Sequence, residues 1–164
     1  MTAANTTYTG ARDAEDGWIV RGVRNGLVAS VAMAMVMMVL GLFDTGFFAA
    51  PSSIWAFWVG PSGYEPTALS LSFVLGAMGH MMNSAILGIV FAFLASRLLH
   101  LNGTVPSVMA GVAFALVVMA VMWNVLLPLG PYGQIVKDSA ATWIWVLGHA
   151  AYGMVGGFLY STWR

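Results

Sequence analysis

The stretch VPSVMAGVAFALVVMAVMWNVLL, from Val105 to Leu127, decides the fold class because it contains no charged side chain. A helix needs about 20 consecutive apolar residues to cross the hydrocarbon core of a bilayer, and this stretch meets that length. Three further stretches share the pattern in their central parts and run over residues 22–43, 68–96 and 140–163. The sequence therefore predicts an all-α integral membrane protein with four membrane-spanning helices.

The overall composition supports a membrane protein and excludes several functions. Hydrophobic residues make up 60% of the 164 positions and charged residues only 7%, with a mean hydropathy of +0.84. The formal net charge is zero, so the chain lacks the basic surface that binding to nucleic-acid phosphates requires. The absence of cysteine excludes disulfides, thiolate metal sites and iron–sulfur clusters. No hydrolase triad, phosphate-binding loop or zinc motif is recognisable, and we expect no enzyme activity.

The chain divides into a polar N-terminal tail at residues 1–17 and a membrane domain at residues 18–164. The tail lacks the ordered regions of a cleavable signal peptide, so the first apolar helix is interpreted as an uncleaved anchor. The basic residues are unevenly distributed, which indicates that both termini face the cytoplasm. On that side lie Arg12, Arg21, Arg24, Arg97 and Arg164, whereas the opposite side carries only Lys137.

The outer connection between the first two helices, from Asp44 to Thr67, is long and unusually apolar. Pro51 and the later prolines are expected to stop helices from continuing into this loop. Two interpretations of the loop remain open. It either lies along the membrane interface or packs against a partner protein.

The two halves of the membrane domain resemble one another, which indicates an internal duplication. Phe43-Asp44 and Pro51 align with Trp123-Asn124 and Pro131. After a shorter second loop, Ser70, Gly79-His80, Gly88 and Phe91 align with Ser139, Gly148-His149, Gly157 and Tyr160. The sequence thus predicts a four-helix bundle built from two helical hairpins, about residues 22–97 and 105–164, related by a pseudo-twofold axis along the membrane normal.

Each half carries one histidine within a predicted membrane span, and such a residue is a functional hypothesis by default. At about 1.5 Å per residue, His80 and His149 lie roughly 22 to 26 Å from the arginines that follow their helices. Small and polar residues share the histidine faces, so both rings are expected in the bundle interior. We expect them to join a polar network of Asn83, Ser84, Tyr152 and Asn124.

Two kinds of role for the histidine pair remain open. Neutral rings with hydrogen-bonding partners would lock the bundle without any cofactor. Alternatively, the rings would ligate haem b or copper, with Asp44 as a further metal ligand. The space for a haem would come from four nearby glycines, Gly76, Gly79, Gly148 and Gly153. Met78 and Met82 point away from His80 on a helix and are not expected to be ligands.

Three motifs make this chain similar to known proteins. They are the string Gly148-His149-Ala150-Ala151-Tyr152-Gly153, the earlier Gly79-His80, and the Leu-Leu-Pro that ends at Pro128. The chain resembles a group of small prokaryotic four-helix integral membrane proteins that have no assigned function. Helix 2 departs from the group pattern, because Ser84 stands where glycine is expected. The resemblance implies the fold, the pairing of the histidines and a prokaryotic cytoplasmic membrane, but no activity.

The function predicted from the sequence is that of a small multi-pass membrane protein acting as a non-catalytic accessory or assembly subunit. Its partners would be the lipid bilayer and either a larger membrane complex or further copies of the chain. The alternative is a haem b or copper protein that uses His80 and His149.

Overall fold

A computed structural model of the protein describes the backbone of residues 6–162 and the side chains of residues 17–162. This part of the chain is helical and contains no β-strand. Its four long helices are α1 (Thr6–Gly41), α3 (Leu71–Phe93), α4 (Thr104–Val121) and α7 (Thr142–Thr162). The shorter elements are α2 (Ala49–Val59), η1 (Pro61–Gly63), η2 (Leu94–Leu98), η3 (Met122–Leu126), α5 (Leu127–Leu129) and α6 (Gly133–Asp138).

Three of the helical segments are long and apolar enough to cross a membrane. They are Gly17–Gly41, Leu71–Leu98 and Thr104–Leu129, and the last two include the π-helical segments η2 and η3. α7 is long enough, but its histidine, tyrosines and glycines keep its apolarity below that level. The all-helical class is therefore confirmed, and three helices are candidate membrane spans by their length and composition.

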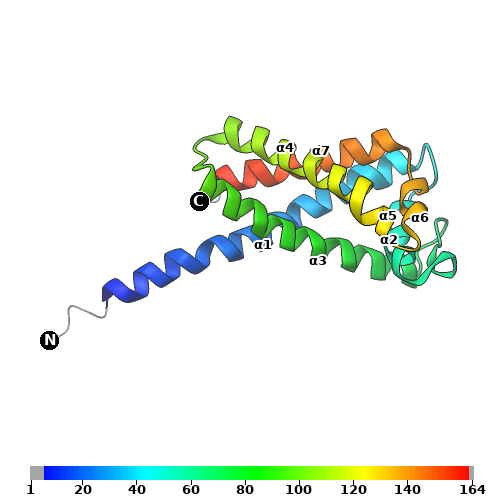
Figure 1. The fold of residues 1–164 in the computed structure, drawn as a ribbon, viewed down its shortest axis with the longest axis horizontal. Helices are drawn as coiled ribbons and strands as arrows, with labels where there is room; N and C mark the ends of the chain where they lie inside the picture. Colours follow the sequence, from blue (N-terminus) through cyan, green and yellow to red (C-terminus); the bar gives the residue numbers. More distant parts are fainter. Residues whose placement is uncertain (1–5, 163–164) are drawn as a thin grey trace.

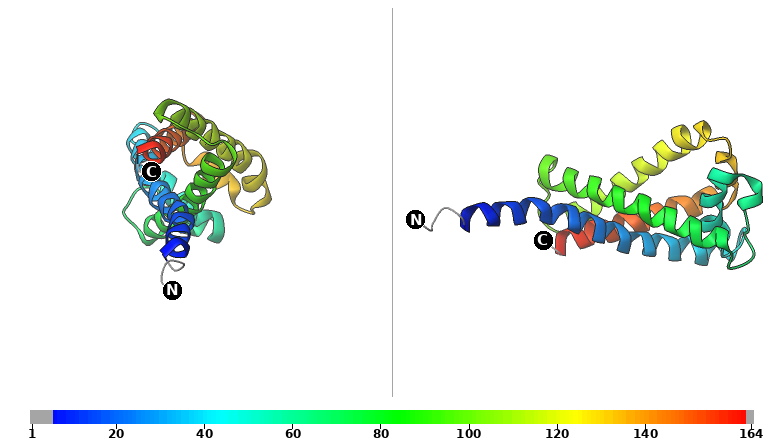
Figure 2. Two further views of the ribbon diagram at one scale, coloured as in Figure 1. Left: turned by 90° about the vertical axis from the view of Figure 1, so that its left-hand side faces the viewer. Right: turned by 90° about the horizontal axis from the view of Figure 1, so that it is seen from below.

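The long helices run alternately up and down the bundle (Figure 1), so the start of α1, the end of α7 and the loop before α4 lie at one end. Residues 42–70 and 127–141 lie at the opposite end (Figures 1 and 2). The most closely packed helix pairs are α1 with α3, α4 with α7, and α1 with α7. α1 and α7 are therefore the central helices, and α3 and α4 flank them.

The first hairpin, α1 with α3, is held by a backbone-to-backbone crossing at small residues. A Cβ atom added at Gly26 would meet the main chain of Ser84 and Gly88, and one added at Gly88 would meet Gly22 and Gly26. The absence of side chains at these glycines lets the two backbones touch. The four-residue spacing of Gly22 and Gly26 places both on one face of α1.

The second hairpin, α4 with α7, crosses in the same way. A Cβ atom added at Gly111 would meet the main chain of Gly153 and Gly157, and one added at Gly157 would meet that of Ser107. The sequence alignment pairs Gly157 with Gly88, and the same offset pairs Gly153 with Ser84. Equivalent positions of α3 and α7 therefore make equivalent backbone contacts within their own hairpins.

The packing of one hairpin on the other does not follow a twofold axis. Such an axis would turn the contact between α1 and α7 into an equal contact between α4 and α3. α3 and α4 are not among the closely packed pairs, and the rings of Phe91 and Phe114 bridge them with centroids 5.5 Å apart. The predicted pseudo-twofold relation of the hairpins is therefore not confirmed.

The two connections at the end opposite the termini form a cap, which comprises residues 42–70 and 127–141. Within it, α2 packs against α3, since Gly76 lies directly on the carbonyl of Pro51. Pro51 stands in the first turn of α2, where a proline is tolerated because its missing N–H has no helical partner. The loop from Asp44 to Thr67 thus folds back onto its own bundle, which neither sequence interpretation anticipated.

Candidate functional site: an interior histidine pair

His149 lies on α7 in the interior of the bundle and is 6% exposed. Its Nδ1 atom lies 2.8 Å from the carbonyl oxygen of Trp145, one turn earlier on the same helix. Because a carbonyl only accepts hydrogen bonds, Nδ1 carries the proton and donates it. In the neutral ring, the lone pair is therefore on Nε2.

His80 reaches the same neighbourhood from α3. Its Nε2 atom is buried and has no hydrogen-bond partner among the described residues. A main-chain group of Ser30 on α1 lies beside the ring. Each hairpin therefore contributes one histidine that reaches the bundle interior, and His80 lies next to the central helix α1.

Two other buried polar groups near the pair lack partners in the described part of the chain. They are the hydroxyl of Ser30, which is 0% exposed, and the indole nitrogen of Trp145. The rings of Trp145 and His149 have centroids 6.1 Å apart. Unpartnered buried polar groups are uncommon and costly, and three of the four such atoms in the described residues belong to Ser30, His80 and Trp145.

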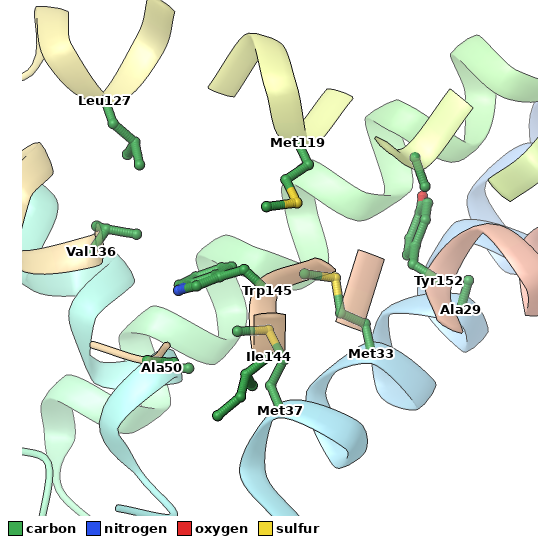
Figure 3. Packing of buried hydrophobic residues seen from close by; sticks show 12 residues of the cluster. Ala29, Met33, Met37, Ala50, Met119, Leu127, Val136, Ile144, Trp145 and Tyr152 are labelled. Atoms are coloured by element: carbon green, nitrogen blue, oxygen red, sulfur yellow. The ribbon is translucent and has the colours of Figure 1, made fainter. Parts of the chain in front are cut away.

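Methionine side chains supply much of the remaining lining. Met33 and Met37 from α1 and Met119 from α4 point toward Trp145 on α7 (Figure 3), and all three are buried. The sulfur of Met37 lies 3.0 Å from the position that a Cβ atom on Gly148 would take. A soft thioether therefore lies against the residue that precedes His149.

The four glycines that the sequence proposed as space for a haem are already in contact with protein. Gly76 touches the carbonyl of Pro51, and Gly153 touches that of Gly111. Gly148 faces Met37, and the nearest atom to a Cβ on Gly79 is an Ile54 methyl at 3.8 Å.

One of these glycines, Gly153, also lines a small void. A void of about 10 Å³, lined in part by Tyr152 and Gly153, is the size of one water molecule. Because protein atoms already occupy the positions beside Gly76, Gly148 and Gly153, these glycines do not provide the space that a haem would need, and this structure does not fit a haem there.

Asp44 is not part of the histidine neighbourhood. It is exposed at the end of α1, where its Oδ2 atom accepts a hydrogen bond of 2.6 Å from the N–H of Ala141. Ala141 lies directly before α7, so Asp44 acts as a cap for that helix. In the described residues, no three His, Asp or Glu side chains are close enough to hold a metal ion together. The structure therefore does not assemble His80, His149 and Asp44 as a ligand set.

The predicted polar network is present only in part. The hydroxyl of Tyr152 on α7 donates a hydrogen bond of 2.8 Å to the carbonyl of Ser84 on α3, and both residues are buried. Asn83 and Asn124 are exposed instead, and Asn124 donates to the carbonyl of Ala120 within its own helix. The placement of these two asparagines in the interior was wrong, because each lies on the outward side of its helix.

The sequence had indicated some of the residues that line this position. Ser30 continues the seam of small residues on the first helix, and Trp145 shares the face of His149. Met33 and Met37 are four positions apart on one helical face, but nothing in the sequence showed that this face meets Gly148. No family model, curated protein or solved structure matches this chain significantly.

Proposed function

We propose that this chain is a multi-pass membrane protein with α7 as its fourth crossing, and that it acts as a non-catalytic accessory or assembly subunit. At about 1.5 Å per residue, the 21 residues of α7 extend over about 31 Å, which matches a hydrocarbon core of about 30 Å. Because α7 packs between α1 and α4, its polar residues contact protein. A helix enclosed in this way does not need to be apolar on all sides.

The observation that carries the accessory role is the contrast between a filled interior and an apolar exterior. The glycines around the histidines are in contact with backbone or side chains, which argues against a substrate path there. In the cap, Phe43 is 83% exposed, and Trp58 and Leu69 are each 70% exposed. A molecule that is closed inside and apolar outside acts through its outer surface, by contacts with lipids and other membrane proteins.

The crossing of α7 is tested with single cysteines, since the natural chain has none. Cysteines are introduced at Gln134 in the cap and at Ser161 near the end of α7. We expect an impermeant maleimide to label the two positions from opposite sides of sealed vesicles. Labelling of both positions from the same side would refute the fourth crossing.

The accessory role is tested by chemical crosslinking in native membranes, followed by purification in a mild detergent. We expect the chain to be recovered in a defined larger assembly, and Trp58→Ser to reduce its yield. Met109→Ser, a matched change at another exposed apolar residue, should leave the yield unchanged. Recovery of the wild-type chain only as a monomer would contradict the proposal.

Copper binding is a second candidate function, and a specific observation favours it over haem. His80 and His149 each have an Nε2 atom without an assigned hydrogen bond, and the thioether of Met37 lies next to Gly148. Imidazole and thioether groups are the ligands that suit Cu(I). Met37 thus takes the place that the sequence interpretation had given to Asp44.

The copper candidate is tested by titrating the purified protein with Cu(I) against a chromogenic chelator. We expect one ion per chain, lost in His80→Ala and bound at least tenfold more weakly in Met37→Leu. Met78→Leu is the matched control, since Met78 is 62% exposed and lies on the outside of α3. Equal affinities of the wild type and the His80→Ala variant would exclude this site.

A further inference from the structure

A second polar region lies at the end of the bundle where α1 and α7 meet the loop before α4. It is a cavity of about 330 Å³ between α1, the end of α3 with η2, the following loop and α7. Its polar lining consists of Arg21, Asn25, Ser96, His100, Asn102 and Tyr160. This cavity is far larger than the void near Tyr152 and holds a small polar group rather than a single water molecule.

Asn25 forms the buried end of this cavity. The side chain is 5% exposed, and its Oδ1 atom has no hydrogen-bond partner among the described residues. Asn25 also lines the smaller void beside Gly26 and Gly88, which places it between the cavity and the helix crossing. A buried acceptor without a partner costs about 1–3 kcal/mol, so the position favours a ligand that brings a hydrogen-bond donor.

Arg21 gives the cavity its charge. It lies one turn before Asn25 on α1, and its Nε atom donates a hydrogen bond of 2.9 Å to the carbonyl of Gly17. This bond uses one of five N–H donors and orients the guanidinium group. The cavity lining in the described part of the chain includes no Asp or Glu. An arginine in such surroundings is suited to bidentate binding of a phosphate group.

The cavity lies at the level where lipid headgroups are expected. Arg21 and Arg24 are the charged residues that precede the uncharged stretch of α1, and Trp18 lines the cavity. Tryptophan is typical of the membrane interface. Exposed apolar side chains flank the cavity, with Val20 68% exposed, Leu98 67% exposed and Leu99 53% exposed. A phospholipid placed here would lay its acyl chains on these residues and its headgroup in the cavity.

We infer that this cavity binds the headgroup of an anionic phospholipid that carries hydroxyl groups, such as a phosphatidylglycerol. The phosphate pairs with Arg21, and a headgroup hydroxyl donates to Oδ1 of Asn25 after the Asn25 amide rotates toward the cavity. A zwitterionic headgroup is disfavoured, because its cationic group meets Arg21 and finds no carboxylate among the described residues of the lining. The inference does not depend on the accessory role or on copper binding, since it uses none of their residues.

Native mass spectrometry of the full chain in detergent tests this inference, with phosphatidylglycerol and phosphatidylcholine of identical acyl chains. We expect phosphatidylglycerol to be retained at least tenfold more strongly. Arg21→Gln should remove most of that preference, Arg21→Lys should restore only part of it, and Asn25→Leu should weaken binding several-fold. If the Asn25→Leu variant does not fold, the Arg21 variants still test the inference. The Arg21 side chain is only half-buried, so its replacement should leave the fold intact.

Arg24→Gln is the matched control, because it removes the same charge from an exposed position outside the cavity lining. We expect this variant to bind like the wild type. Equal retention of the two lipids, or equal losses in Arg21→Gln and Arg24→Gln, would overturn the proposal. Glycerol phosphate and inorganic phosphate serve as competitors. Displacement of the lipid by either of them at equal concentration would show a site for a free anion and overturn the lipid assignment.

Discussion

The two hairpins share one kind of helix crossing but place their histidines in different surroundings. Gly26 contacts Ser84 and Gly88 in the first hairpin, as Gly111 contacts Gly153 and Gly157 in the second. The histidines differ more. His149 is buried and bonded to a carbonyl, whereas the ring of His80 is only partly buried and its Nε2 lacks a partner. The two hairpins thus share the backbone contact at their glycine crossings. The polar contacts of their histidines differ, because the residues around each histidine differ.

The largest expected effect comes from closing either crossing with a methyl group. Gly26→Ala and Gly111→Ala each place a Cβ atom against helix backbone, which cannot move aside without separating the helices. Overpacking typically costs 1–3 kcal/mol, and we expect about 3 kcal/mol for each variant because the obstacle is backbone. Thermal unfolding in detergent measures the loss.

Gly79→Ala is the control for both crossings, because its nearest neighbour is a side-chain methyl at 3.8 Å. We expect it to be neutral or stabilising by up to about 1 kcal/mol, since alanine favours a helix over glycine. If one crossing tolerated alanine and the other did not, the equivalence of the hairpins would be broken.

A second effect should separate the two histidines. His149→Leu removes a buried ring and its hydrogen bond, so we expect a loss of about 1–2 kcal/mol. His80→Leu removes a buried nitrogen without a partner and should be neutral or stabilising by about 1 kcal/mol. Denaturant unfolding of the metal-free protein measures both variants. Equal destabilisation by the two changes would contradict the proposed difference between His149 and His80.

A smaller effect is expected at the hydrogen bond that joins the hairpins. Tyr152→Phe deletes the donor to the Ser84 carbonyl but keeps the ring, and we expect a loss of about 1 kcal/mol. Tyr132→Phe is the matched control, since Tyr132 is 37% exposed in the cap. Thermal unfolding compares the two variants. A larger loss for the control would show that the interior bond contributes little.

The smallest effect is expected at the cap of α7. Asp44→Ala removes the acceptor for the Ala141 N–H, and we expect a loss of about 0.5 kcal/mol because the site is exposed. Asp44→Asn retains an acceptor oxygen and should restore most of the stability. If the asparagine variant were as unstable as the alanine variant, the negative charge rather than the hydrogen bond would be responsible.

The parts of the fold that follow from local sequence were predictable. Long apolar stretches without charge predicted the three helices that are candidate spans in the structure, because the cost of placing charge in lipid dominates there. The glycine pairs in α3 and α7 indicated close helix contacts for a similar reason, since small residues allow backbones to approach. The return of α2 onto α3 was not predictable, because it depends on the contact of Pro51 with Gly76, which are distant in the sequence.

It was harder to predict which polar residues face the interior, because a small rotation of a helix changes which of its side chains point inward. Asn83 and Ser84 differ by about 100° around α3, and only Ser84 faces the bundle. Asn124 falls within the π-helical segment η3, where the wider turn shifts the phase of the residues. One histidine reaching the interior from each half was predictable, because the same Gly-His dipeptide marks both halves of the sequence.

The central position of α7 has a consequence for how the protein is made. α7 is the last of the long helices to leave the ribosome, yet it packs between the first, α1, and its own predecessor, α4. Under the four-crossing proposal, the face of α1 that packs on α7 contacts lipid until α7 enters the bilayer. If synthesis stalls before Thr142, the surfaces of α1 and α4 that α7 covers in the folded protein stay exposed. Cellular quality control could then recognise these surfaces.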